Sequence, residues 1–304
     1  MIDPVLGAAR LLQFTSALLL FGATLFRLQV QRTGTDDTAA APALYRWLLP
    51  SAALIGALSG LAWLSAEAQS LTDDWSAVGD VITGTSLGRI LALRSALFAS
   101  ALVLYPLIPG GHPRWVILGA IGATATASCA WTGHGASGSG AAGLLHQAAD
   151  VLHLLAAGVW IGALVDLSLL VLHHGTPGIG VTRRLTRGLL NFSVIGPVVV
   201  AVLVLSGVLN SGFLLGPEYR AALFTAYGLV LLVKVALFGG MLALAALNRL
   251  RLTPRLQTAL DTGTGTDLAV HALRWSLLTE TALALLVLAA VALLGMLVPP
   301  ASGI

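Results

Sequence analysis

Two histidines and an aspartate have the spacing of one helical face. His146, Asp150 and His153 are four and three residues apart within one long apolar segment, AGLLHQAADVLHLLAAGVWIGALVDLSLLVL. At about 100° per residue, their side chains fall within roughly 60° of one another. Ionisable groups are costly in hydrocarbon, and imidazole with carboxylate suits Cu(II), Zn or Fe. The stripe therefore predicts a buried metal site.

The segment before this helix offers further ligands. His134 lies in the Gly/Ser-rich stretch CAWTGHGASGSGAAG, which predicts a loop able to fold over the helix end and supply a third imidazole. Cys129 and Met296 are weaker candidates, for which packing is the alternative role. One cysteine and three methionines cannot form a ladder of soft ligands, which favours Cu(II) over Cu(I). Trp131 and Trp160 are expected as walls of the site.

The composition indicates that this site lies in a membrane. Of the residues, 57% are hydrophobic and 10% are charged, with a mean hydropathy of +0.91. We therefore predict an all-α, polytopic membrane bundle that forms a single domain over residues 1–304. The first apolar stretch lacks a basic leader, so we expect it to stay as a membrane helix. The eight predicted spans are 5–29, 44–66, 87–108, 115–133, 144–172, 188–213, 222–247 and 273–297.

The distribution of arginine predicts the orientation. With eight spans, most arginines fall on one side, whose loops include 174–187 and 248–272, and the positive-inside rule makes this side cytoplasmic. Both termini then lie outside, and the fifth span carries its histidines in its outer half. The pI of about 9.5 fits loops that meet anionic lipid, and no nucleic-acid patch is visible. The arginines assigned to the cytoplasm are Arg27, Arg32, Arg46, Arg114, Arg183, Arg184, Arg187, Arg249, Arg251, Arg255 and Arg274.

Three further charges fall inside predicted spans and need partners. Arg94 lies at a depth similar to that of Asp150, so the two are expected to pair. Lys234 falls near the middle of the membrane and Glu280 in its inner half, close enough for their side chains to meet. These charges have either a structural role or a role along a transport path. Two small-residue steps, Gly56/Gly60 and Gly158/Gly162, predict close helix packing.

Several motifs resemble the copper-resistance protein D (CopD/PcoD) family of bacterial inner-membrane proteins. The resemblance covers most of residues 130–300, including the helix that holds Glu280. Over the first four spans it is limited to hydropathy and GTSLGR at 84–89. The motifs that carry it are HLLAAGVWIGAL at 153–164, WTGHG at 131–135, SGVLNSG at 206–212, TAYGLVLLVK at 225–234, ALNRLRLTPRL at 246–256 and VPP at 298–300.

The resemblance implies a copper-binding protein of the bacterial inner membrane. It implies that copper moves into or across the membrane, with a separate periplasmic carrier of the CopC type as partner. No nucleotide-binding GxxxxGK[ST], DKTG, HExxH or GxSxG motif occurs, which argues against a pump driven by ATP and against a hydrolase.

Two other functions stay open. In the first, His134, His146 or His153 binds haem b in an electron-transfer protein, although bis-histidine ligation needs imidazoles from facing helices. In the second, the protein is a copper sensor or assembly scaffold that does not transport.

Overall fold

The computed structural model describes all residues except 1–2, 33–42, 73–74, 134–139, 173–178 and 304. All regular elements in these residues are helical. The long helices are α1 (Pro4–Arg32), α2 (Ala43–Thr72), α4 (Ser86–Leu107), α5 (His112–Ser128), α6 (Gly140–Leu172), α7 (Ile179–Leu215), α9 (Ala226–Leu247) and α11 (Thr266–Leu294). The short ones are η2 (Trp75–Ala77), α3 (Val78–Gly84), η3 (Cys129–Thr132), α8 (Tyr219–Ala222), η5 (Asn248–Leu252), α10 (Thr253–Thr262) and η6 (Pro300–Gly303).

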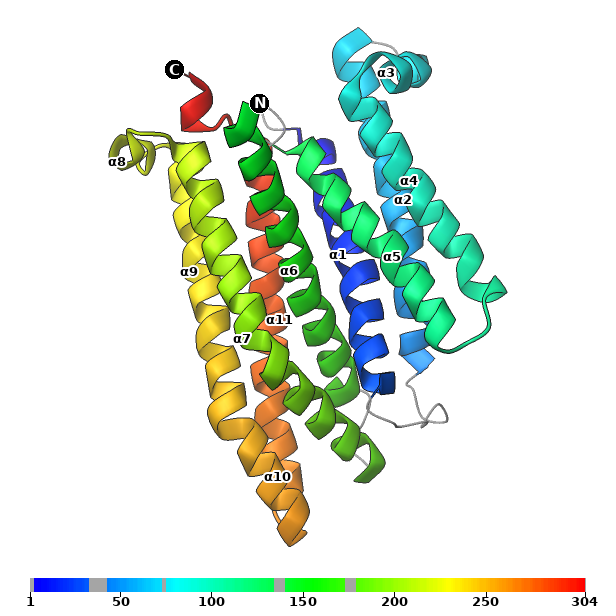
Figure 1. The fold of residues 1–304 in the computed structure, drawn as a ribbon, viewed down its shortest axis with the longest axis vertical. Helices are drawn as coiled ribbons and strands as arrows, with labels where there is room; N and C mark the ends of the chain where they lie inside the picture. Colours follow the sequence, from blue (N-terminus) through cyan, green and yellow to red (C-terminus); the bar gives the residue numbers. More distant parts are fainter. Residues whose placement is uncertain (1–2, 33–42, 73–74, 134–139, 173–178, 304) are drawn as a thin grey trace.

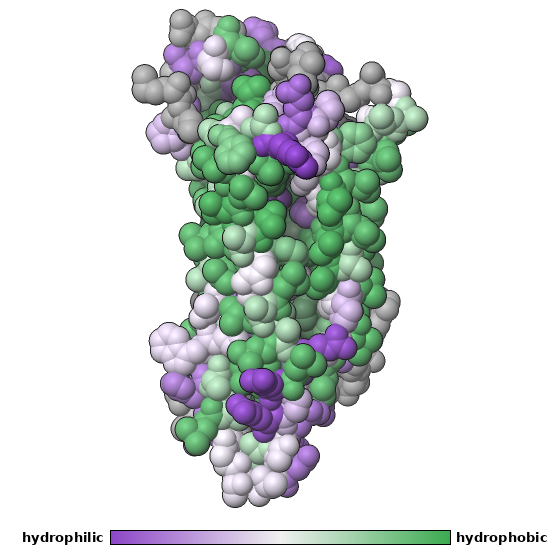
Figure 2. All heavy atoms as spheres, turned by 90° about the vertical axis from the view of Figure 1, so that its left-hand side faces the viewer, coloured by the Kyte–Doolittle hydropathy of each residue, from purple (hydrophilic) through white to green (hydrophobic). Residues whose placement is uncertain are grey.

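The predicted all-α membrane bundle is confirmed. Within the described residues, eight helices are long and apolar enough to cross a membrane, and both termini lie at the same end of the bundle (Figure 1). Apolar side chains cover the outer surface between two more polar ends (Figure 2). On α7, for example, Val194 is 76% exposed and Val208 is 68% exposed. Such a surface is stable when its solvent is lipid.

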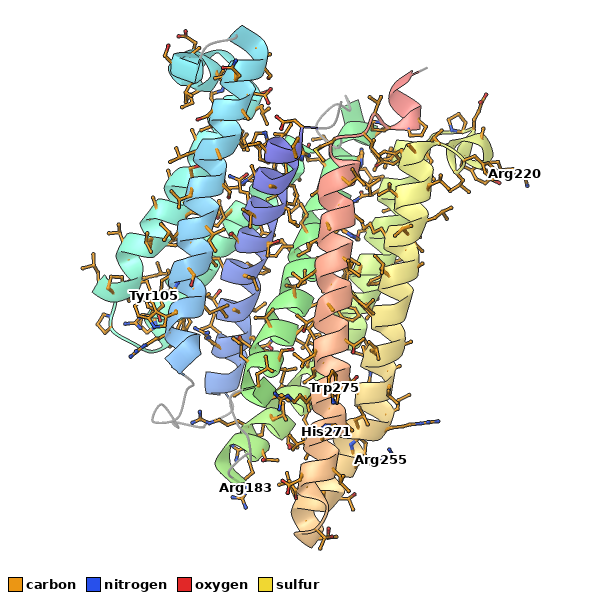
Figure 3. The ribbon with its side chains drawn as sticks, turned by 180° about the vertical axis from the view of Figure 1, so that it is seen from behind. Tyr105, Arg183, Arg220, Arg255, His271 and Trp275 are labelled. Carbon is orange, nitrogen blue, oxygen red and sulfur yellow. The ribbon has the colours of Figure 1, made fainter. Side chains whose placement is uncertain are left out.

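The two ends of the bundle differ in charge. Seen from behind, Arg183 and Arg255 lie near the end remote from the termini, whereas Arg220 lies near the end that carries them (Figure 3). The positive-inside rule predicts that the remote end is cytoplasmic. We call it the inner end below, and the end with the termini the outer end.

The segment predicted as a cytoplasmic loop at 248–272 is mostly helical. The helix α9 continues through the π-helical turn η5 into α10, and a short turn then leads into α11. Gly263 and Gly265 in this turn have φ angles of 70° and 73°, which glycine adopts without strain. Similarly, α7 begins at residue 179, inside the predicted 174–187 loop. Polar sequence marks where the bilayer ends, but a helix can continue into water because its backbone bonds are internal.

The helix α1 lies at the centre of the bundle and packs against α2, α5, α6 and α11. Where it crosses α6, a Cβ atom added at Gly162 would lie only 2.0 Å from the carbonyl carbon of Gly22, and Gly158 meets the same turn. Added Cβ atoms at Gly56 and Gly60 would likewise overlap side chains of α4. Both predicted close-packing steps are therefore confirmed.

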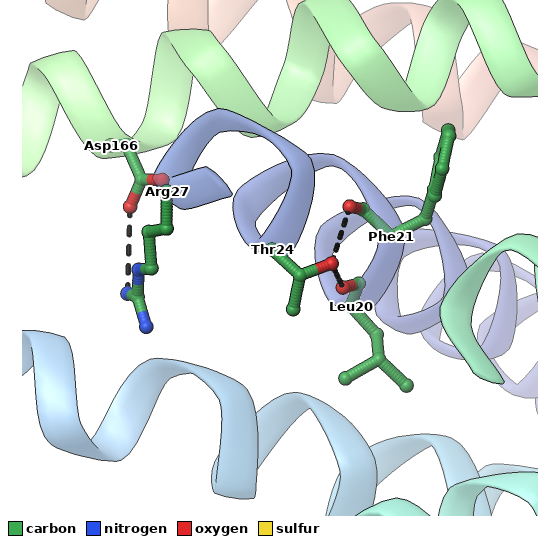
Figure 4. A network of polar contacts seen from close by, with 5 residues as sticks. All are labelled: Leu20, Phe21, Thr24, Arg27 and Asp166. Atoms are coloured by element: carbon green, nitrogen blue, oxygen red, sulfur yellow. Dashed lines mark hydrogen bonds and ion pairs between the residues drawn. The ribbon is translucent and has the colours of Figure 1, made fainter. Parts of the chain in front are cut away.

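An ion pair joins the same two helices nearer the inner end. Arg27 Nη2 lies 3.6 Å from Asp166 Oδ1, with the two side chains 10% and 0% exposed (Figure 4). One turn earlier, the Thr24 hydroxyl bonds the carbonyl oxygens of Leu20 and Phe21 in its own helix. Removing one partner of a buried pair leaves a costly charge, so this contact holds α1 and α6 in one register. The sequence signal for this pair was an acid inside an apolar span.

Candidate metal centre

The predicted stripe lies along the interface between α6 and α7. The helices are antiparallel, and each residue of the stripe meets one residue of α7, two of them in the SGVLNSG motif and the third directly after it. Steps of three and four residues keep these partners on one face of α7, so each lies opposite a residue of the stripe. The pairs are His146 with Phe213, Asp150 with Asn210, and His153 with Ser206.

At the outer end of this row, the His146 ring stacks on Phe213. The ring centroids are 4.7 Å apart and the planes are inclined by 15°, and His146 is buried. Stacking fixes the plane of the imidazole while leaving the ring nitrogens at its edge.

Asp150 occupies the middle of the row. Its Oδ1 accepts a hydrogen bond of 3.2 Å from Asn210 Nδ2. The amide oxygen of Asn210 has no hydrogen-bond partner among the described residues. On the other side, a Cβ atom added at Gly133 would lie 3.8 Å from Asp150 Oδ2. The WTGHG segment therefore lies close to the Asp150 carboxylate at Gly133, the residue before His134.

His153 is held by Ser206, whose Oγ lies 2.9 Å from Nδ1. The Ser206 hydroxyl donates its own proton to the carbonyl oxygen of Val202. Its oxygen can then accept from the ring, an arrangement that favours the tautomer with its proton on Nδ1. This tautomer leaves Nε2 with a free lone pair, the form in which histidine binds a metal.

The row does not form a complete metal site by itself. In the part of the chain that the structure describes, no three His, Cys, Asp or Glu side chains are close enough to hold an ion. His134 lies outside the described residues. Cys129 is buried with Sγ 3.5 Å from the carbonyl oxygen of Ala125, and a Cβ atom added at Gly7 would lie 2.9 Å from Met296 Cε. These two side chains pack against α5 and α1.

The predicted pairing of Arg94 with Asp150 is wrong. No ion pair joins these two described residues. Arg94 is fully buried and donates to Gln13 Oε1 (2.8 Å), to both Oγ (2.9 Å) and O (2.8 Å) of Ser128, and to Thr132 Oγ1 (3.2 Å). Arg94 therefore binds α1 and the end of α5, and it fixes the turn η3 from which the WTGHG segment continues. Equal depth did not imply proximity, because the two residues face different neighbours.

The predicted contact between the side chains of Lys234 and Glu280 is also wrong, because no ion pair joins these two described residues. Glu280 is 3% exposed. Its Oε1 accepts from Trp160 Nε1 at 2.9 Å, and its Oε2 accepts from Asn248 Nδ2 at 3.0 Å. Glu280 thus joins α11 to α6 and to the π-helical turn.

Of the two tryptophans predicted as walls of the site, Trp160 is buried and Trp131 is about half exposed near the outer end.

Lys234 of α9 lies instead near the row between α6 and α7. Its amino group is close enough to Asp150 and His153 to influence their charge, although it forms no ion pair with a described residue. Lys234 and His153 also line one cavity of about 480 Å³ between α7 and α9. When protonated, Lys234 would oppose the positive charge of a metal ion held by the row.

A second cavity of about 460 Å³ lies nearer the inner end. It is lined by Glu280 and Asn248, and Trp160 lines both cavities. Both lie along the side of the bundle where α7 and α9 are neighbours, the side that faces the viewer in Figure 2. We call them the outer cavity and the inner cavity. Trp160 separates them.

Four contributors to these sites were not singled out from sequence. Three of them repeat the spacing of the stripe on the facing helix, two inside the SGVLNSG motif and one directly after it, and this periodicity was the available signal. The fourth lies in the motif ALNRLRLTPRL. The residues are Ser206, Asn210, Phe213 and Asn248.

The fold and site define a polytopic helical membrane protein with a histidine–aspartate row buried between two spans. Residues 1–144 match the family model "Copper resistance protein D-like, N-terminal domain", and residues 187–294 match "Copper resistance protein D". The chain belongs to the copper resistance protein D family. The matched residues include the first four spans, where sequence motifs were sparse.

Two relatives match nearly the whole chain. Copper resistance protein D of Pseudomonas syringae pv. tomato is 37% identical over 98% of this chain and 97% of its own length. Inner membrane protein YebZ of Escherichia coli (strain K12) is 28% identical over 96% of this chain and 97% of its own length. No solved structure matches. Family membership supports a role in copper resistance for this multi-pass membrane protein.

Proposed function

We propose that this protein binds copper at the outer half of the α6–α7 interface and passes it inward across the bacterial inner membrane. The observation that carries the proposal is the row of residues paired across the α6–α7 interface, above all the His153–Ser206 contact, which favours the tautomer of His153 with an unprotonated Nε2. A row that served packing alone would not need ionisable groups in hydrocarbon.

The proposed ligands are His146, Asp150, His153 and His134. The two histidines of α6 are about 10 Å apart along the helix, so one ion held by both would lie between them, beside Asp150. Gly133 already lies against this carboxylate, which supports the next residue, His134, as the imidazole that completes the set. Nitrogen and oxygen ligands favour Cu(II).

The proposed route inward follows the outer cavity, passes Trp160 and continues into the inner cavity. Lys234 lines the outer cavity and Glu280 lines the inner cavity, so these two ionisable side chains lie on opposite sides of Trp160. Since the chain has no ATPase motif, we propose that movement is passive or driven by a gradient. The proposed partner is a periplasmic copper carrier of the CopC type, which would deliver copper to the outer end.

The test is the metal content and visible spectrum of the detergent-purified protein after copper loading. We expect about one copper per chain and no Soret band, with at least a 10-fold loss of affinity in His146→Ala or His153→Ala. His271→Ala is the matched control, because His271 is exposed and bonded to Trp275 near the inner end. Unchanged copper content in a folded His146→Ala/His153→Ala double variant would reject the site.

The same preparation separates the alternative functions. A Soret band at haem stoichiometry would favour the electron-transfer protein. Copper binding without any copper movement into proteoliposomes would favour the sensor or scaffold.

A further inference from the structure

The inner cavity contains a carboxyl group that has no opposite charge beside it. Glu280 is almost completely buried, and its two oxygens each accept one hydrogen bond from a neutral group, the indole of Trp160 and the amide of Asn248. In hydrocarbon, an ionised carboxylate without a cation is far more costly than a neutral acid. Two neutral donors offset only part of that cost.

No cation among the described residues forms an ion pair with Glu280. Arg249 lines the same cavity from η5, but it is exposed and forms no ion pair with Glu280, both residues being described. Lys234 of α9 lines the outer cavity, on the other side of Trp160. The lining residues from α6, α7 and α10 carry no charge.

The cavity is also where two helices depart from regular geometry. The π-helical turn η5 begins at Asn248, and Pro197 interrupts the hydrogen bonding of α7 on the facing wall. Turns of this kind are frequent at functional sites, and irregular backbone at membrane depth occurs where it lines a cavity.

An unused acceptor points to what the cavity holds. The Oδ1 atom of Asn248 is buried and has no hydrogen-bond partner within the described residues. Asn248 lines the cavity beside Glu280. A cavity of about 460 Å³ has ample room for water, which needs such polar partners to be held. A water bonded to Asn248 would connect the carboxyl group with the inner end.

We propose that Glu280 is a proton-binding site, distinct from the copper site, that is protonated in the resting protein and exchanges its proton with water in the inner cavity. On release, the O–H bond of the carboxyl group breaks and water takes the proton. The N–H groups of Trp160 and Asn248 then stabilise the carboxylate. The proposal rests on the inner cavity alone and not on copper binding.

The test is infrared spectroscopy of the complete, metal-free protein in lipid nanodiscs at neutral pH. We expect a carbonyl stretching band of a protonated carboxylic acid that shifts in deuterium oxide and is lost in Glu280→Gln. Asp150→Asn is the matched control, because it removes the other buried acid near the route and should leave this band in place. If Glu280→Gln removes no such band, the proposal is wrong.

A second variant keeps the test decisive if Glu280→Gln does not fold. Trp160→Phe removes one hydrogen bond from the carboxyl group and should move the band without abolishing it, and an unmoved band would overturn the assignment. Loss of the wild-type band on adding sodium or copper ions alone at constant pH would assign the site to a metal and also overturn the proposal. Failure of copper to bind the outer site would leave these results unaffected.

Discussion

Ser206 Oγ lies 2.9 Å from His153 Nδ1 and donates its own proton to the backbone of α7, which favours the tautomer of His153 with hydrogen on Nδ1. We expect Ser206→Ala to lower copper affinity by about 10- to 100-fold, the usual effect of losing a residue that orients a ligand. Titration of the purified variants with copper measures this. Ser206→Thr keeps the hydroxyl and should bind within a few-fold of the wild type. Equal affinity in Ser206→Ala would mean that His153 is not a ligand.

Lys234 and Glu280 should have different roles in copper handling. Lys234 interacts with Asp150 and His153, so Lys234→Met removes a positive charge near the proposed ion and should raise equilibrium copper affinity, by up to about 10-fold. Glu280 lies beyond Trp160, so Glu280→Gln should leave loading unchanged while slowing the appearance of copper inside proteoliposomes. Weaker loading in Lys234→Met, or normal copper movement in Glu280→Gln, would contradict the proposed route.

The crossing of α1 and α6 leaves no space for a side chain at Gly162. A Cβ atom there would overlap the backbone of Gly22, so we expect Gly162→Ala to destabilise the protein by about 1–3 kcal/mol, seen as a lower Tm in detergent. Gly239→Ala on α9 is the control, because no atom lies within 4 Å of its added Cβ, and it should leave the Tm unchanged or slightly raised. Equal Tm values for the two variants would show that α1 and α6 can move apart at this crossing at little cost in stability.

The orientation can be tested with single cysteines in intact cells, since the native Cys129 is buried. Ala221 lies in α8 near the outer end and Thr264 in the turn after α10, and both are exposed. A membrane-impermeant thiol reagent should label Ala221→Cys and should label Thr264→Cys only after lysis. The opposite pattern would invert the topology and turn the proposed loading site toward the cytoplasm.

The sequence predicted the spans and the polar stripe because both depend on local periodicity. His146, Asp150 and His153 share one helical face whatever the tertiary structure. Their partners could not be predicted in the same way, because one sequence does not tell which helices are neighbours or how each is rotated. Arg94 and Asp150 matched in depth, as did Lys234 and Glu280, yet each bonds or interacts with different neighbours.

The central position of α1 has a consequence for synthesis. Two of the helices against which it packs, α6 and α11, are synthesised much later than α1. Its close crossing at Gly22 and its ion pair from Arg27 to Asp166 can form only after α6 has been inserted. Until α6 is inserted, the first four spans therefore leave the face of α1 that will contact α6 exposed in the bilayer. We expect a chain truncated before α6 to keep this face of α1 exposed and to be degraded by membrane proteases, although each of its spans is intact.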